Sequence, residues 1–133
     1  MQTQPLAPPQ ASTEPASAHL RAVRTYYELV DSGQVQDLVE LFADDAEYHR
    51  PGYEPLVGRA QLTDFYRTRR VIREGRHTVT TTVESGDSVA VHGEFNGVLH
   101  DDRETSLRFA DFFRLDADGR FSRRDTFFFA PLV

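Results

Sequence analysis

The chain has 133 residues, enough for one domain and little more. Its residues are 39% hydrophobic and include ten phenylalanines, so it can fill a core, which excludes wholesale disorder. A formal charge of -6 argues against sequence-independent nucleic-acid binding, and the lack of cysteine excludes disulfides, thiolate metal ligands and a cysteine nucleophile. No apolar run is long enough to span a membrane, and no basic-then-apolar leader opens the chain. We therefore expect a cytoplasmic protein that binds neither membranes nor nucleic acid.

Residues 1–17 differ in composition from the rest of the chain. They are rich in Pro, Ala, Gln, Ser and Thr, and Leu6 is their one large apolar side chain. Such a segment cannot bury enough apolar surface to become ordered. We expect a disordered tail over residues 1–17, in the simplest case a solubilising leader, followed by one domain over residues 18–133.

The first half of the domain carries helical patterns. From Ala18 to Ser32-Gly33, apolar side chains recur with the period of one helix face. These side chains are Leu20, Val23, Tyr27 and Val30, flanked by Tyr26. Shorter patterns predict a second helix over about Val35–Phe42 and a third over about Arg59–Arg70.

The second half is typical of strands joined by tight turns. Thr- and Val-rich or alternating segments are separated by short turn sequences at hairpin spacing. The predicted strands are Thr78–Glu84, Val89–Leu99, Thr105–Leu115 and Phe121–Phe129, and a short extended piece, Glu47–Arg50, comes before the third helix. Helices followed by a meander predict an α+β fold, with helices on one face of a curved antiparallel sheet. A cavity between sheet and helices is the natural place for a ligand.

One predicted strand breaks its own pattern. Alternate residues of Leu107–Leu115 form an apolar row with a carboxylic acid, Asp111, at its centre. Alternate side chains share a face, so Asp111 belongs among large apolar groups, where an unpaired charge is costly. Burial favours the neutral acid, which can donate a hydrogen bond, whereas a partner arginine keeps the acid charged. A third alternative also stays open: a backbone amide or an arginine satisfies the carboxyl, which then does no chemistry.

The neighbouring strands are less decisive. In the last strand, Arg124, Thr126 and Phe128 share one face. In the strand Val89–Leu99, His92 lies on the face opposite the apolar one. That face holds either acid and base groups or simply a wetted outer surface.

Short motifs along the domain resemble the bacterial Δ5-3-ketosteroid isomerases. The matching segments are Tyr26–Gly33, Phe42–Ala46, Gly58-Arg59, Phe65–Arg67 and Arg114–Arg120. They cover nearly everything after the tail and indicate the nuclear-transport-factor-2-like superfamily, which includes the SnoaL-like polyketide cyclases, limonene-epoxide hydrolases and scytalone dehydratase. The resemblance implies a cone-shaped fold, in which a strongly bent sheet and its helices enclose a deep apolar pocket. It indicates the fold more than the reaction, since this fold hosts many chemistries.

The resemblance implies two hydrogen-bond donors, but this sequence lacks the general base of the isomerases. Tyr26 stands where the isomerases use a helix tyrosine to donate to the developing enolate, and Asp111 where a protonated aspartic acid shares that oxyanion hole. Phe42 replaces a supporting tyrosine. The isomerase base, an aspartate before a proline, is replaced by Arg50, which cannot accept a proton at neutral pH. Thr126 replaces the catalytic aspartate of the epoxide hydrolases, which disfavours their mechanism too.

Histidines are the candidates to replace the missing base, because imidazole titrates near neutrality. His49, His77 and His92 qualify, and His49 leads because it adjoins the position of the isomerase base, although strand alternation can point it away. We therefore expect Tyr26, Asp111 and His49 to be catalytic. The histidines lack close ligand spacing, so we expect neither a metal nor a cofactor.

Two arginines are candidates for binding the substrate. Arg50 and Arg124, the latter at a position that is apolar in the isomerases, suit a carboxylate, phosphate or enolate oxygen. The alternative is that Arg124 pairs with Asp111 or Asp125 while Arg50 reaches solvent. The basic run Arg67–Arg76 is either a grip on an anionic ligand or, more simply, a solvated helix end. The other expected substrate-binding residues are Phe109, Phe113, Phe128 and His92.

Three functions remain open. The first is a cofactor-independent enzyme for an apolar carbonyl or polyketide-like substrate, an isomerase, cyclase or dehydratase of natural-product biosynthesis. The second is a binding module for a hydrophobic acid. The third is a dimerisation domain that uses outward-facing Phe112, Phe127 and Phe129. From the habit of the superfamily we also expect a homodimer.

Overall fold

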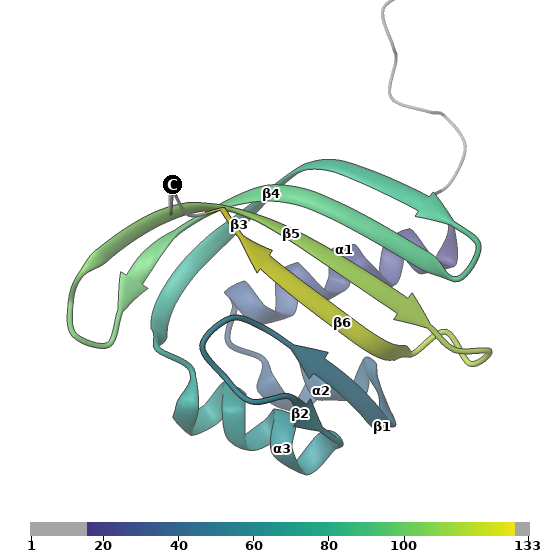
Figure 1. Ribbon diagram of the computed structural model, residues 1–133, viewed down its shortest axis with the longest axis horizontal. Helices are drawn as coiled ribbons and strands as arrows, with labels where there is room; N and C mark the ends of the chain where they lie inside the picture. The colour runs from purple at the N-terminus through teal and green to yellow at the C-terminus, as the bar shows by residue number, and fades with distance from the viewer. Residues whose placement is uncertain (1–15, 130–133) are drawn as a thin grey trace, which may run out of the picture.

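Helices and strands follow one another in the order shown in Figure 1, a computed structural model that describes residues 16–129. The elements are α1 (Ala18–Asp31), α2 (Val35–Glu40), β1 (Phe42–His49), β2 (Leu56–Val57), α3 (Arg59–Asp64), the π-helical turn η1 (Phe65–Arg69), β3 (Ile72–Ser85), β4 (Ser88–Leu99), β5 (Glu104–Leu115) and β6 (Phe121–Phe128). The predicted tail lies outside the described residues except for Ala16 and Ser17.

Six strands form one curved sheet in the order β2-β1-β6-β5-β4-β3. The long strands β3 to β6 pair antiparallel, as the hairpin spacing predicts. The sheet is mixed rather than wholly antiparallel, because β1 pairs parallel with β6 and sets Tyr48 opposite Arg124. This pairing joins the first and the last strand of the chain and sets their inward-facing side chains beside one another.

The helices cover the concave side of the sheet. In Figure 1 the long strands arch over α1, while α2 and α3 lie near β1 and β2. The predicted α+β class, with about three helices packed on a strongly curved sheet, is confirmed. The curvature leaves space between α1, η1 and the sheet, and this space becomes the candidate site.

Helix α1 has the boundaries that its sequence predicts. The Ser17 hydroxyl accepts the backbone N–H of Leu20 at 3.1 Å, which caps the first turn. After the last turn, Gly33 adopts a φ of 72°, a left-handed conformation that suits glycine. Adjacent Tyr26 and Tyr27 are both buried, so the buried face of α1 is wider than the single stripe of the sequence pattern.

Three element boundaries differ from the sequence-based expectation. Strand β1 starts at Phe42, directly after α2, and β3 starts at Ile72 rather than Thr78. The third helix is α-helical only to Asp64 and continues as the wider turn η1. Strand β3 lies at the edge of the sheet and starts in polar sequence, where alternation is weak, whereas β1 contains the turn-like pair Asp44-Asp45, which hides its start at Phe42. The turn η1 matters because π-helical turns often occur at functional sites.

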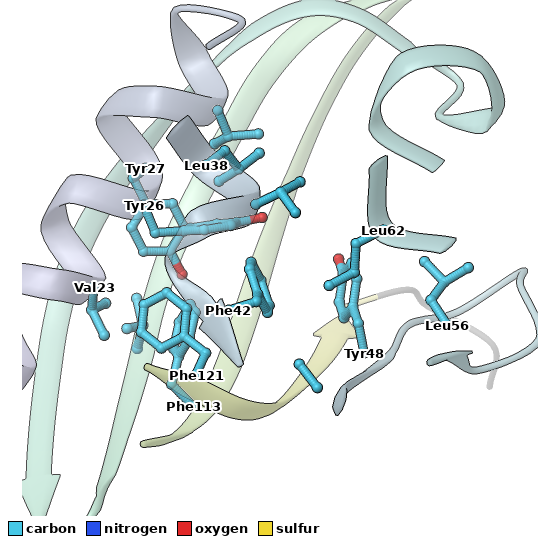
Figure 2. Packing of buried hydrophobic residues seen from close by; sticks show 14 of the residues in the cluster. Val23, Tyr26, Tyr27, Leu38, Phe42, Tyr48, Leu56, Leu62, Phe113 and Phe121 are labelled. Atoms are coloured by element: carbon cyan, nitrogen blue, oxygen red, sulfur yellow. The ribbon is translucent and has the colours of Figure 1, made fainter. Parts of the chain in front are cut away.

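Aromatic rings fill most of the core. Figure 2 shows one group beside α1, which contains Tyr26, Phe42, Phe113 and Phe121, and a second group around Tyr48. Phe42 and Phe121 are fully buried, with ring centroids 5.2 Å apart in an edge-to-face arrangement. Such pairs add to the stabilisation from burial. Together with Tyr26, they pack α1 against the first residues of β1 and β6, the elements that carry several of the site residues.

Candidate functional site

A cavity of about 190 Å³ lies between the sheet, α1 and η1. Its deep wall is made by buried side chains: Tyr26, Tyr48, Phe95, Phe109, Arg124 and Thr126. Its outer part is lined by less buried residues, among them Arg70, Val71, Leu99 and Thr105. A cavity of roughly 150 Å³ holds a benzene ring, so this one has room for one or two rings.

The position of one deep ring depends on two glycines. A Cβ atom at Gly75 would lie 2.3 Å from the ring of Phe95, and one at Gly97 would lie 2.6 Å from it. Both distances are far below van der Waals contact, so larger residues there would displace the ring. The glycines on β3 and β4 therefore shape this wall of the cavity.

Asp111 is fully buried and accepts hydrogen bonds from four groups. Arg124 donates to it twice, from Nε at 3.2 Å and from Nη2 at 2.9 Å, and the hydroxyls of Tyr27 and Thr126 also donate to it. Every partner is a donor, which is the environment of an ionised carboxylate. Asp111 does not line the cavity. This geometry favours the alternative of an arginine-paired carboxylate over a neutral acid in an oxyanion hole.

Arg124 forms part of the cavity wall in front of Asp111. It is only 4% exposed, and its guanidinium carbon lies 4.3 Å from the ring centroid of Tyr26 and 4.5 Å from that of Tyr48. Burial has the largest single effect and disfavours its charge, but Asp111 together with Tyr26, Tyr48 and Tyr66 outweighs burial and holds the pKa of Arg124 above its ordinary value. The cavity therefore keeps a fixed positive group at its deep end.

Two phenols that line the cavity accept hydrogen bonds from this guanidinium group. The Nη1 atom of Arg124 donates to the hydroxyls of Tyr26 and Tyr66, and the two hydroxyl oxygens lie 2.6 Å apart. Burial raises the pKa of Tyr26 well above its ordinary value and that of Tyr66 to about 12, although Arg124 acts in the opposite sense on both. Both phenols stay protonated at neutral pH. One of their two hydrogens is used between them, which leaves the other for a ligand oxygen.

His77 faces the cavity from β3 and is held by α1. Its Nδ1 atom lies 2.6 Å from Oδ1 of Asp31, and its backbone N–H donates to Oδ2 at 2.8 Å. The Asp31 carboxylate selects the Nδ1-protonated tautomer, so Nε2 can accept a proton. Burial lowers the pKa of His77 below its ordinary value of 6.5, against the opposing effect of Asp31. The imidazole is therefore neutral at pH 7, as a general base must be.

Two more arginines line the cavity. The guanidinium carbon of Arg50 lies 5.2 to 5.3 Å from the ring centroids of Tyr53, Phe65 and Phe128. Arg70 follows η1 and lies beside the ring of Tyr66. The Nε atoms of both arginines are buried without a hydrogen-bond partner among the described residues. The prediction that Arg50 faces the pocket agrees with this placement. Arg70 belongs to the basic run, for which a grip on an anionic ligand was one of the two alternatives.

Three predicted site residues lie elsewhere. Tyr48 points inward, so its neighbour His49 points outward beside Glu47, with 3.3 Å between Nε2 and the carboxylate. His92 lies on the outer face of β4, beside Thr80 and Arg108. Phe113 is buried in the core against Tyr26 rather than at the cavity. None of these three residues therefore lines this cavity, contrary to their expected placement.

The other predicted contacts do meet at the cavity. Tyr26, Arg50, Phe109, Arg124 and Phe128 all line it. The residues of the site to which the sequence assigned no role are Asp31, Tyr48 and Tyr66. Tyr66 lies inside a segment of the resemblance, which was the one signal that pointed to it.

Residues 16–129 offer neither of two other kinds of site. No three His, Asp or Glu side chains among them lie close enough together to hold a metal ion. None of the helices there is long and apolar enough to cross a membrane. The polar groups that face the cavity are phenols, an imidazole, threonine hydroxyls and three guanidinium groups.

Solved structures share this architecture over most of their length. An NTF2-like protein of unknown function from Burkholderia pseudomallei K96243 is 21% identical, with a TM-score of 0.78 over 86% of this chain and 92% of that one. The epoxide hydrolase/cyclase-like enzyme SalBIII, described in pyran ring formation in the polyether salinomycin, is 20% identical, with a TM-score of 0.74 over 84% of this chain and 90% of that one. TerC, co-crystallised with polyporic acid, is also 20% identical, with a TM-score of 0.75 over 85% of this chain and 92% of that one. The fold is therefore NTF2-like, as the sequence motifs predict.

The sequence itself defines the family more narrowly. Residues 23–124 match the model of the SnoaL-like domain. The match runs from the buried face of α1 to Arg124 on β6, so it includes nearly all of the cavity wall. The chain belongs to the SnoaL-like domain family.

Proposed function

We propose that the protein is a cofactor-independent enzyme that moves a proton on a small carbonyl compound. The observation that carries this proposal is His77, a buried imidazole held by Asp31 in a cavity that also presents phenol donors backed by Arg124. A base and a set of oxyanion donors are the two parts that enolisation needs. The SnoaL-like family and the cyclase-like neighbour support the same class of reaction.

The proposed step is transfer of a proton from carbon to His77. The Nε2 atom removes a proton from the carbon beside the substrate carbonyl, and the electron pair moves to the carbonyl oxygen. The Tyr66 hydroxyl donates to this developing oxyanion, with Tyr26 and Arg124 behind it. Isomerisation follows if His77 returns the proton to another carbon. Cyclisation follows if the enolate carbon attacks a second carbonyl carbon of the same molecule, whose oxygen takes up the electron pair of the broken π bond and then the proton from His77.

Asp111 has an indirect role in this proposal. It holds the guanidinium of Arg124 through two hydrogen bonds, so it positions the cation that supports the phenols. It acts as a positioning residue rather than as an oxyanion donor. Tyr26 keeps its expected place among the donors but acts through Tyr66 and Arg124.

Hydrogen exchange tests the proposal without knowledge of the natural substrate. We would incubate the protein in D₂O with a panel of one- and two-ring ketones and follow loss of the α-proton by NMR. The account predicts exchange catalysed by the wild type and lost in His77→Gln, with His92→Gln as the matched control because His92 lies on the outer face. Absence of catalysis with the wild type, or equal catalysis by His77→Gln, contradicts it.

The outer face of the sheet supports a homodimer. Phe112, Phe127 and Phe129 are 50%, 56% and 66% exposed, and the rings of Phe112 and Phe127 pack edge to face at 5.8 Å. Such an apolar patch is unusual on an isolated domain. We propose that a second copy covers it, on the opposite side of the sheet from the cavity, so that dimerisation and catalysis are compatible.

A further inference from the structure

Positive charge in the cavity is not balanced by its acidic residues. Three guanidinium groups line it, from Arg50, Arg70 and Arg124. Asp111 is committed to Arg124, and Asp31 is committed to His77. Within residues 16–129, no carboxylate oxygen lies within 4.0 Å of a guanidinium nitrogen of Arg50 or Arg70. The cavity therefore carries two uncompensated cations, although the chain as a whole has a charge of -6.

The packing of these two arginines leaves their edges available. Aromatic rings surround Arg50, and Tyr66 lies beside Arg70, at centroid distances of 5.2 to 5.9 Å. Aromatic rings interact with the flat face and the charge of a guanidinium group, and they do not accept hydrogen bonds from its N–H groups, which point outward in its plane. The buried Nε atoms of both residues accordingly lack partners among the residues that the structure describes. Buried donors without acceptors are rare in folded proteins, which points to a ligand that supplies the acceptors.

The two arginines lie at the outer end of the cavity. Arg50 comes directly after β1 and also borders a shallow surface pocket with Pro51 and Tyr53. Arg70 precedes the exposed Val71. The deep end, by contrast, holds Arg124 and the phenols. A ligand bound in the cavity would therefore place an anionic group at the rim and an uncharged oxygen at the deep end.

We infer that the substrate is a ring-containing carboxylic acid, whose carboxylate is bound by Arg50 and Arg70 while its carbonyl oxygen faces Tyr66. The assignment of the carbonyl end rests on the proposed function; the anion site does not. Two forked guanidinium groups among aromatic rings match a flat monoanion, because each can give parallel hydrogen bonds to one carboxylate. A phosphate can accept the same bidentate hydrogen bonds, so the test includes a phosphate probe.

The test compares two probes that differ only in charge. Binding of 2-naphthoate and of its neutral amide, 2-naphthamide, would be measured by isothermal titration calorimetry. We expect naphthoate to bind at least about tenfold more tightly, the effect of one charge-assisted contact. Arg50→Gln and Arg70→Gln should each remove this advantage without changing the affinity for the amide. Arg67→Gln is the matched control, because Arg67 lies on η1 outside the cavity lining.

Each outcome decides the inference. Equal binding of the two probes, no binding of either, or no effect of Arg50→Gln and Arg70→Gln would overturn it. Tighter binding of 2-naphthyl phosphate than of naphthoate would overturn the choice of a carboxylate. Naphthoate binding is measured without any turnover, so failure of the proposed catalysis and failure of the anion site give different results. Amide binding and circular dichroism report whether each variant is folded.

Discussion

The imidazole of His77 on β3 and the carboxylate of Asp31 at the end of α1 are joined by two hydrogen bonds, across 46 residues of chain. One hydrogen bond orients the imidazole through Nδ1, and the other holds the backbone of β3 at His77 against the end of α1. The strand and the helix thereby hold a single tautomer of a ring that lines the cavity. This pair is the part of the site that the resemblance to the isomerases did not imply.

Removal of the imidazole tests its role as base. His77→Gln should lower the exchange rate of a ketone substrate by roughly 10² to 10⁴, the usual contribution of a general base. Asp31→Asn should cause a smaller loss and shift the tautomer of His77, since it keeps the shape but not the charge. Rates measured by NMR for these variants and for His92→Gln separate the two roles. A rate in His77→Gln equal to that of His92→Gln contradicts the assignment.

The pH dependence follows from the lowered pKa of His77. Activity should be constant above pH 6.5 and fall only below it, as the base becomes protonated. Folding is linked in the same direction: the unfolded chain binds this proton more readily, so the stability contributed by neutral His77 is lost as the pH falls below 6.5. A pH–rate profile with its acid limb above pH 6.5 would not agree with this account.

The ion pair behind the phenols should matter for stability. Asp111→Asn leaves the buried charge of Arg124 without its partner, and Arg124→Met leaves the buried charge of Asp111 without its partner. Each variant should therefore lower the free energy of unfolding by about 3–5 kcal/mol. The double variant Asp111→Asn/Arg124→Met should lose clearly less than the sum of the two single losses, because no charge remains unpaired. Urea unfolding measures all three. Additive losses would show that the two side chains are not coupled.

The phenol that faces the ligand should affect turnover more than folding. Tyr66→Phe should lower the ketone exchange rate by roughly 10² to 10³, as the loss of one oxyanion donor does. Its effect on unfolding should be only about 1 kcal/mol, for the lost hydrogen bonds. Tyr53→Phe is the control, since its hydroxyl donates to the backbone of Arg69 at 3.1 Å and lies outside the cavity. Equal rates for the two variants would remove Tyr66 from the mechanism.

The outer face of the sheet should control the oligomeric state. Phe127→Asp places a charge in the centre of the exposed aromatic patch and should convert a dimer to a monomer, as measured by light scattering during size-exclusion chromatography. Ketone exchange should persist, because the patch lies on the opposite side of the sheet from the cavity. A wild-type protein that is already monomeric would contradict the proposed dimer.

Period and alternation predicted the parts of this fold that depend on local sequence. The alternation around Asp111 correctly placed it on the buried face, and the periodicity of α1 correctly placed Tyr27 there but left the equally buried Tyr26 at the side of the stripe. The start of β3 was not predicted, because an edge strand with Arg, Glu and Gly has no clear alternation. Because this strand lacks a clear alternation, the sequence also did not predict that His77 points toward the cavity.

The chemistry of the site depends on contacts between distant segments, and these have no local signal. Asp111 could be a neutral donor or an arginine's partner, and only the pairing of β5 with β6 decides between them. His49 lies beside the predicted base position, yet its direction was fixed by Tyr48, which the parallel pairing with β6 turns inward. The resemblance therefore predicted the fold correctly, while the proposed base had to come from the geometry.

The protonation of His77 is the most direct test of the central claim. Its two ring nitrogens can be observed by long-range ¹H–¹⁵N NMR across a pH titration, with His77→Gln used to assign the signals. The account predicts a hydrogen on Nδ1, none on Nε2 at pH 7, and a pKa below 6.5. A hydrogen on Nε2, or a pKa above 6.5, would contradict a neutral base that faces the cavity.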